Sequence, residues 1–390
     1  MKITAMEPMM PRAEATALDD LAFDLVAKAN RLAGQIQPSV RESIGDLVRS
    51  MNCYYSNLIE GHDTHPRDID AALEENYSDD DGKRSLQREA RAHIEVQRLI
   101  DCGYDPDEAP TSIKYIQWLH REFCERLPEE MLWLENPKTG KRVQIIPGEF
   151  RDGEVEVGRH VPPPENVLSE FLERFEEAYD FDRLPKSKAI IAIAASHHRF
   201  LWIHPFFDGN GRVARLMAHS MMLRSEVGCS IWSVSRGLAR NSVEYKSKLM
   251  EADSAREGDL DGRGALSASA LERFCEFFLS TAIDQVEFME GLLQPSELLR
   301  RMKLYVDDEV SANRLPPRSM SLLREAFIAG EFERGRAPEI TGYQERRGRE
   351  ILSKLLSKGL LVSQGPRAPV RLGFPLDVVE RWFPQLYPVT

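Results

Sequence analysis

This 390-residue sequence lacks any run of eighteen consecutive apolar residues, so no membrane-spanning helix is expected. Residues 1–20 also lack the basic start and apolar stretch of a secretory signal. Basic residues are outnumbered, 51 against 63 acidic ones, and the net charge of −12 argues against a chain that coats nucleic acid with its whole surface. These absences favour a cytoplasmic protein without a membrane partner.

Cysteine is scarce and scattered along the chain. No CxxC pair occurs, and the number of cysteines is odd, so neither a disulfide framework nor a zinc site is expected. The five residues are Cys53, Cys102, Cys124, Cys229 and Cys275. We expect them to be buried, reduced thiols in a globular protein of two or three domains.

The chain does contain one dense cluster of polar residues and glycines between two apolar segments, 189–202 and 212–223, which are both predicted to be helices. The cluster reads His204-Pro205-Phe206-Phe207-Asp208-Gly209-Asn210-Gly211-Arg212-Val213-Ala214-Arg215. Its glycines allow the backbone to turn tightly and to approach a ligand closely. The helix that follows would direct its free N–H groups at the same place, which makes a binding site for phosphate.

The side chains of this cluster extend the phosphate interpretation. Arg212 and Arg215 lie three residues apart on one helix, so both can reach a single polyphosphate. Asp208 is a hard oxygen ligand suited to Mg²⁺, and His204 can take up a proton near neutral pH. The residues therefore predict a Mg-nucleotide site with a general base. The plainer alternative is a capped turn between two helices.

These residues resemble the core signature of the Fic (filamentation induced by cAMP) family, H-P-F-x-[D/E]-G-N-G-R-x-x-R, at every fixed position. The resemblance implies a mainly α-helical Fic-type core that transfers AMP from ATP to a Ser, Thr or Tyr hydroxyl of a protein. It implies His204 as the base and Asp208 as the Mg²⁺ ligand. The nucleotide phosphates would be held by Gly209, Asn210, Gly211, Arg212 and Arg215. Positioning and charge neutralisation of this kind are most of what phosphoryl-type transfer requires.

A second motif ends the helix predicted from residue 39 onward. Ser56 and Glu60 lie one turn apart, and Gly61 is a natural helix stop. Alone, the segment indicates a helix end with a solvated glutamate. It also resembles the inhibitory signature of Fic proteins, [S/T]-x-x-x-E-[G/N]. That resemblance implies a bidentate ion pair between Glu60 and Arg215, which would deprive ATP of an arginine and keep the enzyme inactive.

A β-hairpin is predicted where residues 142–146 and 153–158 alternate on either side of Pro147-Gly148. The hairpin is either a plain surface feature or the flap that it resembles in Fic proteins. A flap of this kind would hold the target protein by strand addition.

Further along the chain, Asn241 and Tyr245 resemble residues of the Fic adenine pocket. They are four apart, so they are expected to share a helix face. A helix cap and a core tyrosine are the structural alternative. We expect His197, His198 and His219 to be packed core histidines.

The last segment, 296–390, resembles a winged helix-turn-helix, with predicted helices at 320–329 and 344–358 and strand-like residues at 369–374. Residues 333–371 contain nine basic and four acidic side chains. Arg346, Arg347 and Arg349 begin the candidate recognition helix, where DNA readers place their contacts. DNA binding and protein binding both stay open for this module.

The sequence thus predicts an N-terminal helical region with the inhibitory helix (1–110), a Fic catalytic core (111–295) and a winged-helix-like domain (296–390). The predicted function is autoinhibited AMPylation of a target protein or of the chain itself, with ATP and Mg²⁺. Removal of AMP, transfer of another nucleotide and a DNA-binding regulator whose core senses nucleotide are the alternatives. A homodimer that buries the inhibitory helix is a further hypothesis.

Overall fold

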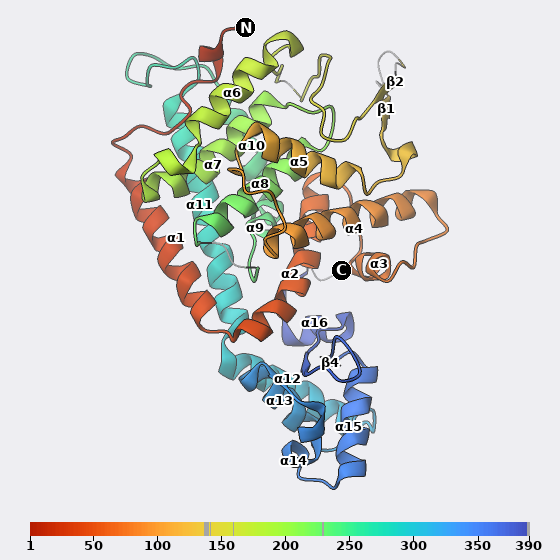
Figure 1. The fold of residues 1–390 in the computed structure, drawn as a ribbon. Helices are drawn as coiled ribbons and strands as arrows, with labels where there is room; N and C mark the ends of the chain where they lie inside the picture. The colour runs from red at the N-terminus through yellow and green to blue at the C-terminus, as the bar shows by residue number, and fades with distance from the viewer. Residues whose placement is uncertain (136–139, 141, 159, 228–229, 388–390) are drawn as a thin grey trace. The chain divides into compact units, whose positions relative to one another are not determined.

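The computed structural model is mainly helical and describes the whole chain except residues 136–139, 141, 159, 228–229 and 388–390 (Figure 1). The chain divides into two compact units. The first contains Met1–Ala29, Asn52–Cys229 and Ser233–Gln285, and the second contains Asn30–Met51, Ser230–Trp232 and Val286–Thr390. The three sequence domains expected above stay a prediction.

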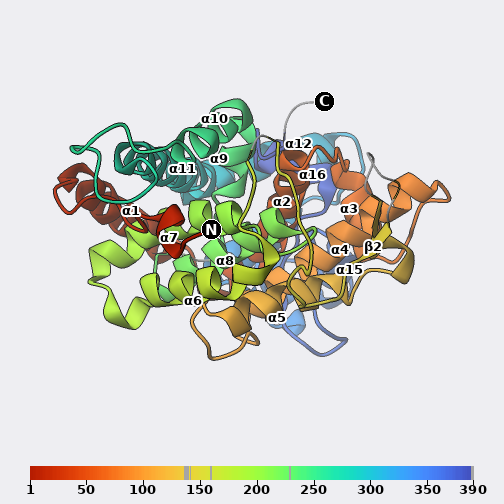
Figure 2. The same cartoon turned by 90° about the horizontal axis from the view of Figure 1, so that it is seen from above.

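Helices α7 and α8 form the centre of the first unit, with α5 and α6 to one side and α10 and α11 to the other (Figure 2). Almost every residue of α7 is buried because its run Ala189–Ala195 is apolar on all sides. The helices that contribute to this unit are α1 (Thr16–Gly34), α2 (Pro38–Ile59), α3 (Pro66–Leu73), α4 (Asp81–Asp101), α5 (Ile113–Cys124), α6 (Leu168–Ala178), α7 (Lys186–Ile203), α8 (Asn210–Arg224), α9 (Ser235–Arg240), α10 (Ser242–Ala252) and α11 (Ala268–Leu293). Among the described residues, none of the helices has the length and apolar character needed to cross a membrane.

A small two-stranded hairpin is present, but the predicted pairing of residues 142–146 with residues 153–158 is wrong. Strand β2 (Arg142–Gln144) pairs antiparallel with β1 (Trp133–Glu135), which precedes it in the chain. Residues 153–158 form no strand and contribute only an isolated bridge between Val157 and His160. Pro147 and Gly148 do form a turn, in which the Glu149 N–H donates to the Ile146 carbonyl at 3.0 Å, but residues 153–158 do not pair with β2 after it. The Gly148 N–H instead donates to His120 Nδ1 at 2.9 Å and holds this segment against α5.

The N-terminal segment, which its prolines and lack of bulky residues predict to be loose, is packed. Met6 is fully buried. The Tyr179 hydroxyl donates to the Met9 carbonyl at 2.5 Å, and the Arg199 guanidinium donates to the Pro8 carbonyl at 2.8 Å. Tyr179 lies 170 residues from Met9 in the sequence, and Arg199 lies 191 residues from Pro8. The local composition of the N-terminal segment therefore could not predict these contacts.

The expectation of buried thiols holds for three cysteines. Cys53, Cys124 and Cys275 are buried, whereas Cys102 is exposed because it directly follows the end of α4. Cys229 lies outside the described residues.

In its described residues, the C-terminal part of the second unit contains five α-helices and a small sheet. The helices are α12 (Pro295–Ser311), α13 (Ser319–Ala329), α14 (Ala337–Thr341), α15 (Glu345–Ser357) and α16 (Leu376–Trp382). Strands β3 (Glu331–Phe332), β4 (Leu361–Val362) and β5 (Val370–Leu372) pair antiparallel in the order β3-β5-β4. Buried apolar residues of α13, α15, β5 and α16 build its core, among them Leu322, Ile351, Leu355, Val370 and Trp382. The helices and strands lie close to their predicted positions, while the winged-helix assignment stays a prediction.

Candidate active site

The polar cluster forms a tight turn between α7 and α8. His204 ends α7 in the left-handed conformation (φ 49°, ψ 62°), and Gly209 precedes α8 with φ 81°. The side chain of Asn210 bridges the turn, donating to the Phe206 carbonyl at 2.8 Å and accepting from the Phe206 N–H at 3.0 Å. A left-handed histidine is a strained residue that persists only where its surroundings fix it. The two hydrogen bonds between Asn210 and Phe206 therefore fix the backbone of the turn.

Because the Asn210 side chain is engaged in these hydrogen bonds, the groups of the turn that can donate to an anion are its backbone N–H groups. The first N–H groups of a helix have no partner within that helix. Asp208 is exposed beside them. Within the described part of the chain, no three His, Cys, Asp or Glu side chains lie together as a metal site. A single carboxylate that shares Mg²⁺ with nucleotide phosphates fits the way this ion is usually bound.

The imidazole of His204 is in the neutral form that a general base requires. Burial, assisted by the nearby positive charge of Arg151, lowers the pKa of its imidazole to about 4. Desolvation disfavours the imidazolium form because a charged ring loses its hydration. The ring is therefore neutral at pH 7 and free to accept a proton.

Arg215 is occupied by the end of α2. Its Nε donates to Ser56 Oγ at 2.8 Å, and its Nη2 lies 2.5 Å from Glu60 Oε1. The Arg215 side chain is only 2% exposed and that of Glu60 is 34% exposed. The ion pair predicted from sequence is present, but it is not bidentate, because Ser56 takes the Nε position that a second carboxylate oxygen would need.

Glu60 lies against the first turn of α8. A Cβ atom added at Gly211 would overlap Glu60 Oε1, so the missing side chain of this glycine makes room for the carboxylate. Burial alone would raise the pKa of Glu60, but the charge and hydrogen bond of Arg215 outweigh it and hold the pKa below its usual value. The carboxylate is thus an anion at the helix start, where a phosphate would otherwise be favoured.

Arg212 has partners that the sequence did not indicate. Its Nη2 lies 2.6 Å from Glu89 Oε2 on α4, and its guanidinium lies over the Phe123 ring, 5.0 Å from the centroid. His62 Nδ1 lies 3.1 Å from the same Glu89 oxygen, a contact that raises the pKa of His62. Glu89 is one of several carboxylates on a polar helix, and nothing in its spacing distinguishes it.

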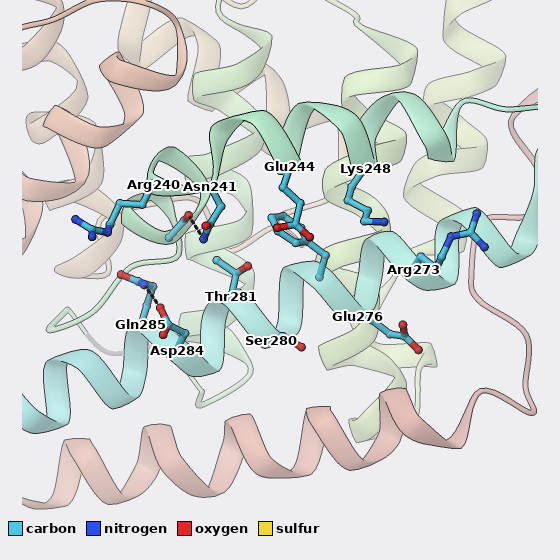
Figure 3. Close-up of a pocket in the computed structure, with 12 residues that line it drawn as sticks. Arg240, Asn241, Glu244, Lys248, Arg273, Glu276, Ser280, Thr281, Asp284 and Gln285 are labelled. Carbon is cyan, nitrogen blue, oxygen red and sulfur yellow. Dashed lines mark hydrogen bonds between the residues drawn. The ribbon is translucent and has the colours of Figure 1, made fainter.

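Asn241 lines a groove of about 720 Å³ between α9–α10 and α11 (Figure 3). Its Nδ2 donates to the Gly237 carbonyl at 3.1 Å. The walls carry charges of both signs, from Arg240, Lys248 and Arg273 and from Glu244, Glu276 and Asp284. A groove of this character suits a polar ligand more than an apolar one.

Tyr245 does not share this groove. It is 2% exposed, and its hydroxyl lies 2.7 Å from His197 Nε2 in the core. The predicted common face fails because Asn241 (φ −109°, ψ 34°) precedes α10 and does not follow the helical spacing. In this arrangement the Tyr245 ring is not accessible to a purine.

The three other histidines are core residues, as predicted. His197 is fully buried against Tyr245. His198 Nε2 lies 3.1 Å from the Leu249 carbonyl, and His219 Nε2 lies 2.7 Å from Asp101 Oδ1.

The three arginines predicted to begin a recognition helix lie on the exposed face of α15. Each forms an ion pair within that helix: Arg346 and Arg347 with Glu350, at 3.2 and 3.1 Å, and Arg349 with Glu345, at 2.9 Å. Their positive charge is therefore partly neutralised on the same helix.

Comparison with known proteins finds similarity to the family that the turn resembles. Residues 110–222 match the model of the Fic/DOC family. Over 220 residues the chain is 28% identical to a protein named protein adenylyltransferase Fic from Drosophila erecta (55% of this chain, 43% of that protein) and 29% identical to its namesake from Drosophila willistoni (55% and 42%). The chain spans less than half the length of these relatives.

Solved structures share the fold. A Fic family protein from Desulfovibrio desulfuricans G20 superposes with a TM-score of 0.52 and 16% identity, covering 91% of this chain and 96% of that one. Fic-1 from C. elegans gives a TM-score of 0.53 and 18% identity, covering 72% and 74%. At these identities the likeness extends to the fold alone.

Proposed function

We propose that this chain, whose residues 110–222 match the model of the Fic/DOC family, is a protein adenylyltransferase held inactive by its own Glu60. The substrates are ATP and a Ser, Thr or Tyr hydroxyl of a protein, with the chain itself as one candidate target. The observation that carries the proposal is the ion pair between Glu60 and Arg215, at 2.5 Å, against the glycine turn.

The reaction assigned to this site is one displacement at phosphorus. The neutral His204 takes the proton of the target hydroxyl while the hydroxyl oxygen attacks the α-phosphorus of ATP. A new P–O bond forms to the protein, the α–β phosphoanhydride bond breaks, and pyrophosphate leaves with the electron pair. A base whose pKa lies well below 7 is always in its acceptor form at neutral pH.

The remaining residues bind and orient the nucleotide. The N–H groups of Gly209, Asn210 and Gly211 and the guanidinium groups of Arg212 and Arg215 are assigned to the phosphates. Asp208 would hold Mg²⁺, which supplies neutralising charge to the phosphates when bound. The polar groove at Asn241 is the candidate binding site for the rest of the nucleotide.

Inhibition follows from competition for Arg215. A γ-phosphate needs the guanidinium edge that Ser56 and Glu60 occupy, and it would meet the Glu60 carboxylate as a like charge. Removal of the carboxylate would free both the arginine and the space beside Gly211.

The test is labelling with α-³²P-ATP and Mg²⁺ in the wild type, in Glu60→Gly and in Glu60→Gly/His204→Ala. We expect strong labelling of protein by Glu60→Gly alone. Glu60→Gln is the matched variant that keeps the size of the side chain and removes its charge. The proposal fails if no variant labels protein, or if labelling survives the loss of His204.

Two alternatives within the same chemistry are tested by a change of substrate. Labelled UTP and GTP in place of ATP would report transfer of another nucleotide. Release of AMP from a labelled target, lost in Glu60→Gly, would report AMP removal with Glu60 orienting the water.

The DNA-binding alternative depends on the C-terminal module and is the weaker one. Its support is the excess of basic residues in 333–371 and an order of helices and strands compatible with a winged helix. The ion pairs of Arg346, Arg347 and Arg349 on α15 count against it. A gel shift whose affinity falls steeply with salt would favour this function. Light scattering at several concentrations tests the homodimer.

A further inference from the structure

Arg151 is a buried arginine whose donors all point at main-chain carbonyl groups. It is 3% exposed. Its Nε donates to the His204 carbonyl at 2.8 Å, its Nη1 to the Gly153 carbonyl at 2.9 Å, and its Nη2 to the Pro163 carbonyl. Its own N–H donates to the Pro205 carbonyl at 2.9 Å. Among the described residues, no carboxylate forms an ion pair with it.

The position of Arg151 explains why a buried guanidinium is stable there. The last carbonyl groups of a helix lack partners within the helix, and the C-terminal end of a helix favours a positive charge. His204 and Pro205 stand at this end of α7. The guanidinium therefore caps α7 at the residue assigned as the base. Burial still lowers the pKa of Arg151, which is the electrostatic cost of the arrangement.

The segment around Arg151 is also packed on the turn. The Phe150 ring lies 5.2 Å from the Phe206 ring, and a Cβ atom at Gly153 would lie 3.4 Å from Phe207 Cζ. The guanidinium then joins three pieces of chain, namely the Gly153 loop, the Pro163 segment and the end of α7.

We propose that Arg151 is a positioning residue for the base, which fixes His204 in its left-handed conformation through the fork of hydrogen bonds to the backbone. The inference rests on the proposed function for the role of His204 and adds a residue to which no role has been assigned. Arg151 does not touch substrate, so its effect falls on the rate of the chemical step and not on ATP binding.

The kinetic test uses the Glu60→Gly enzyme with Arg151→Ala or Arg151→Lys. Arg183→Ala is the matched control, since Arg183 is exposed and pairs only with Asp180 among the described residues. We expect kcat to fall by about 100-fold in Arg151→Ala, the order of loss caused by a misplaced reacting group, with the KM for ATP nearly unchanged. Guanidinium salt at a non-denaturing concentration should restore part of the activity to Arg151→Ala and none to Glu60→Gly/His204→Ala.

Titration of His204 by NMR separates this inference from the proposed function, because it needs no turnover. We assign the His204 signal by its loss in His204→Ala. Arg151→Lys keeps the positive charge but loses the fork, so the pKa of His204 should rise from about 4 toward its ordinary value as water reaches the ring. The same signal should not move in Arg183→Ala.

Three results would overturn the inference. The first is an unchanged kcat in both Arg151 variants. The second is a higher KM for ATP at unchanged kcat. The third is a pKa of His204 that moves in Arg151→Ala but not in Arg151→Lys, which reports only the lost charge. If Arg151→Ala does not fold, Arg151→Lys decides alone. If Glu60→Gly transfers no AMP, the proposed function fails and the titration still tests Arg151.

Discussion

Arg212 Nη2 lies 2.6 Å from Glu89 Oε2, which makes Arg212 the second arginine of the turn that is paired with a carboxylate. The first, Arg215, is paired with Glu60. His62 contacts the same Glu89 oxygen and stands two residues after Glu60, so one short turn of chain connects the two ion pairs. Both arginines assigned to phosphate thus have an acidic partner from the N-terminal helices.

Loss of Glu89 should destabilise the first unit. The Arg212 and Glu89 side chains are 6% and 15% exposed, so Glu89→Ala leaves a buried guanidinium without its anion. We expect the free energy of unfolding to fall by about 3 kcal/mol, at the lower end of what breaking a buried pair costs. Urea denaturation measures it, and a double-mutant cycle with Arg212→Ala isolates the pair. A coupling energy near zero would mean that the two charges are solvated.

The His62–Glu89 contact should add stability that depends on pH. The pKa of His62 is raised in the folded chain, chiefly by its hydrogen bond to Glu89, with Glu60 raising it and Arg212 lowering it. A raised pKa gives stability that is present below the unfolded pKa of about 6.5 and is lost as pH rises through the folded pKa. His62→Gln should therefore destabilise the protein more at pH 5.5 than at pH 9, as measured by urea unfolding at both values. An equal effect at both values would contradict this.

The sequence was informative where function depends on neighbouring residues. The turn from His204 to Arg215 and the two helices beside it were predicted because the motif is short and its chemistry is local. The same holds for Ser56 and Glu60 at the end of α2, to which an inhibitory role is proposed. The contact of Glu60 with Arg215 was expected from family resemblance, because 155 residues separate them.

The errors arose where packing between distant segments decides the outcome. Residues 142–144 have the alternation of a strand, but that pattern does not identify the partner, which is Trp133–Glu135. The sequence does not distinguish Glu89 from the other carboxylates of α4, because its partner Arg212 lies on α8, 123 residues away. Tyr245 suits a purine site as well as a core. In the structure it is buried with its hydroxyl 2.7 Å from His197 Nε2, while its role in nucleotide binding stays a prediction.

Tyr245→Phe should change stability and leave nucleotide affinity unchanged. The hydroxyl lies 2.7 Å from His197 Nε2, and both residues are buried. Its removal leaves a buried nitrogen without its partner, which costs about 1–3 kcal/mol. Thermal unfolding measures this loss, and ATP titration of Glu60→Gly/Tyr245→Phe measures affinity. A large loss of ATP affinity in a stable variant would instead indicate that Tyr245 contacts the adenine ring of ATP.

Gly237→Ala should test the close approach of α9 to α11. An added Cβ atom would collide with Thr281 Cγ2 and would lie 3.0 Å from Gln285 Cγ. Overpacking of this kind costs about 1–3 kcal/mol. Thr281→Ser in the same chain removes the methyl group and should restore part of the loss. Gly291→Ala is the control, since its Cβ atom would meet nothing within 4 Å, and it should be neutral or stabilising. Equal melting temperatures for Gly237→Ala and the wild type would contradict the packing.

The pH dependence of the Glu60→Gly enzyme should report the buried state of His204. Because burial lowers the pKa of the imidazole to about 4, the base stays neutral and competent down to mildly acidic pH. We expect kcat/KM to stay level between about pH 8 and pH 5.5 and to fall below that, since this ratio follows the ionisation of the free enzyme. Initial rates of AMP transfer across this range measure the profile, with circular dichroism at each pH to show that the fold persists. In Glu60→Gly/Arg151→Lys the acid limb should move to higher pH, because water then reaches the ring. A midpoint near pH 6.5 in Glu60→Gly itself would mean that the imidazole is solvated in the free enzyme, and that desolvation does not prepare the base.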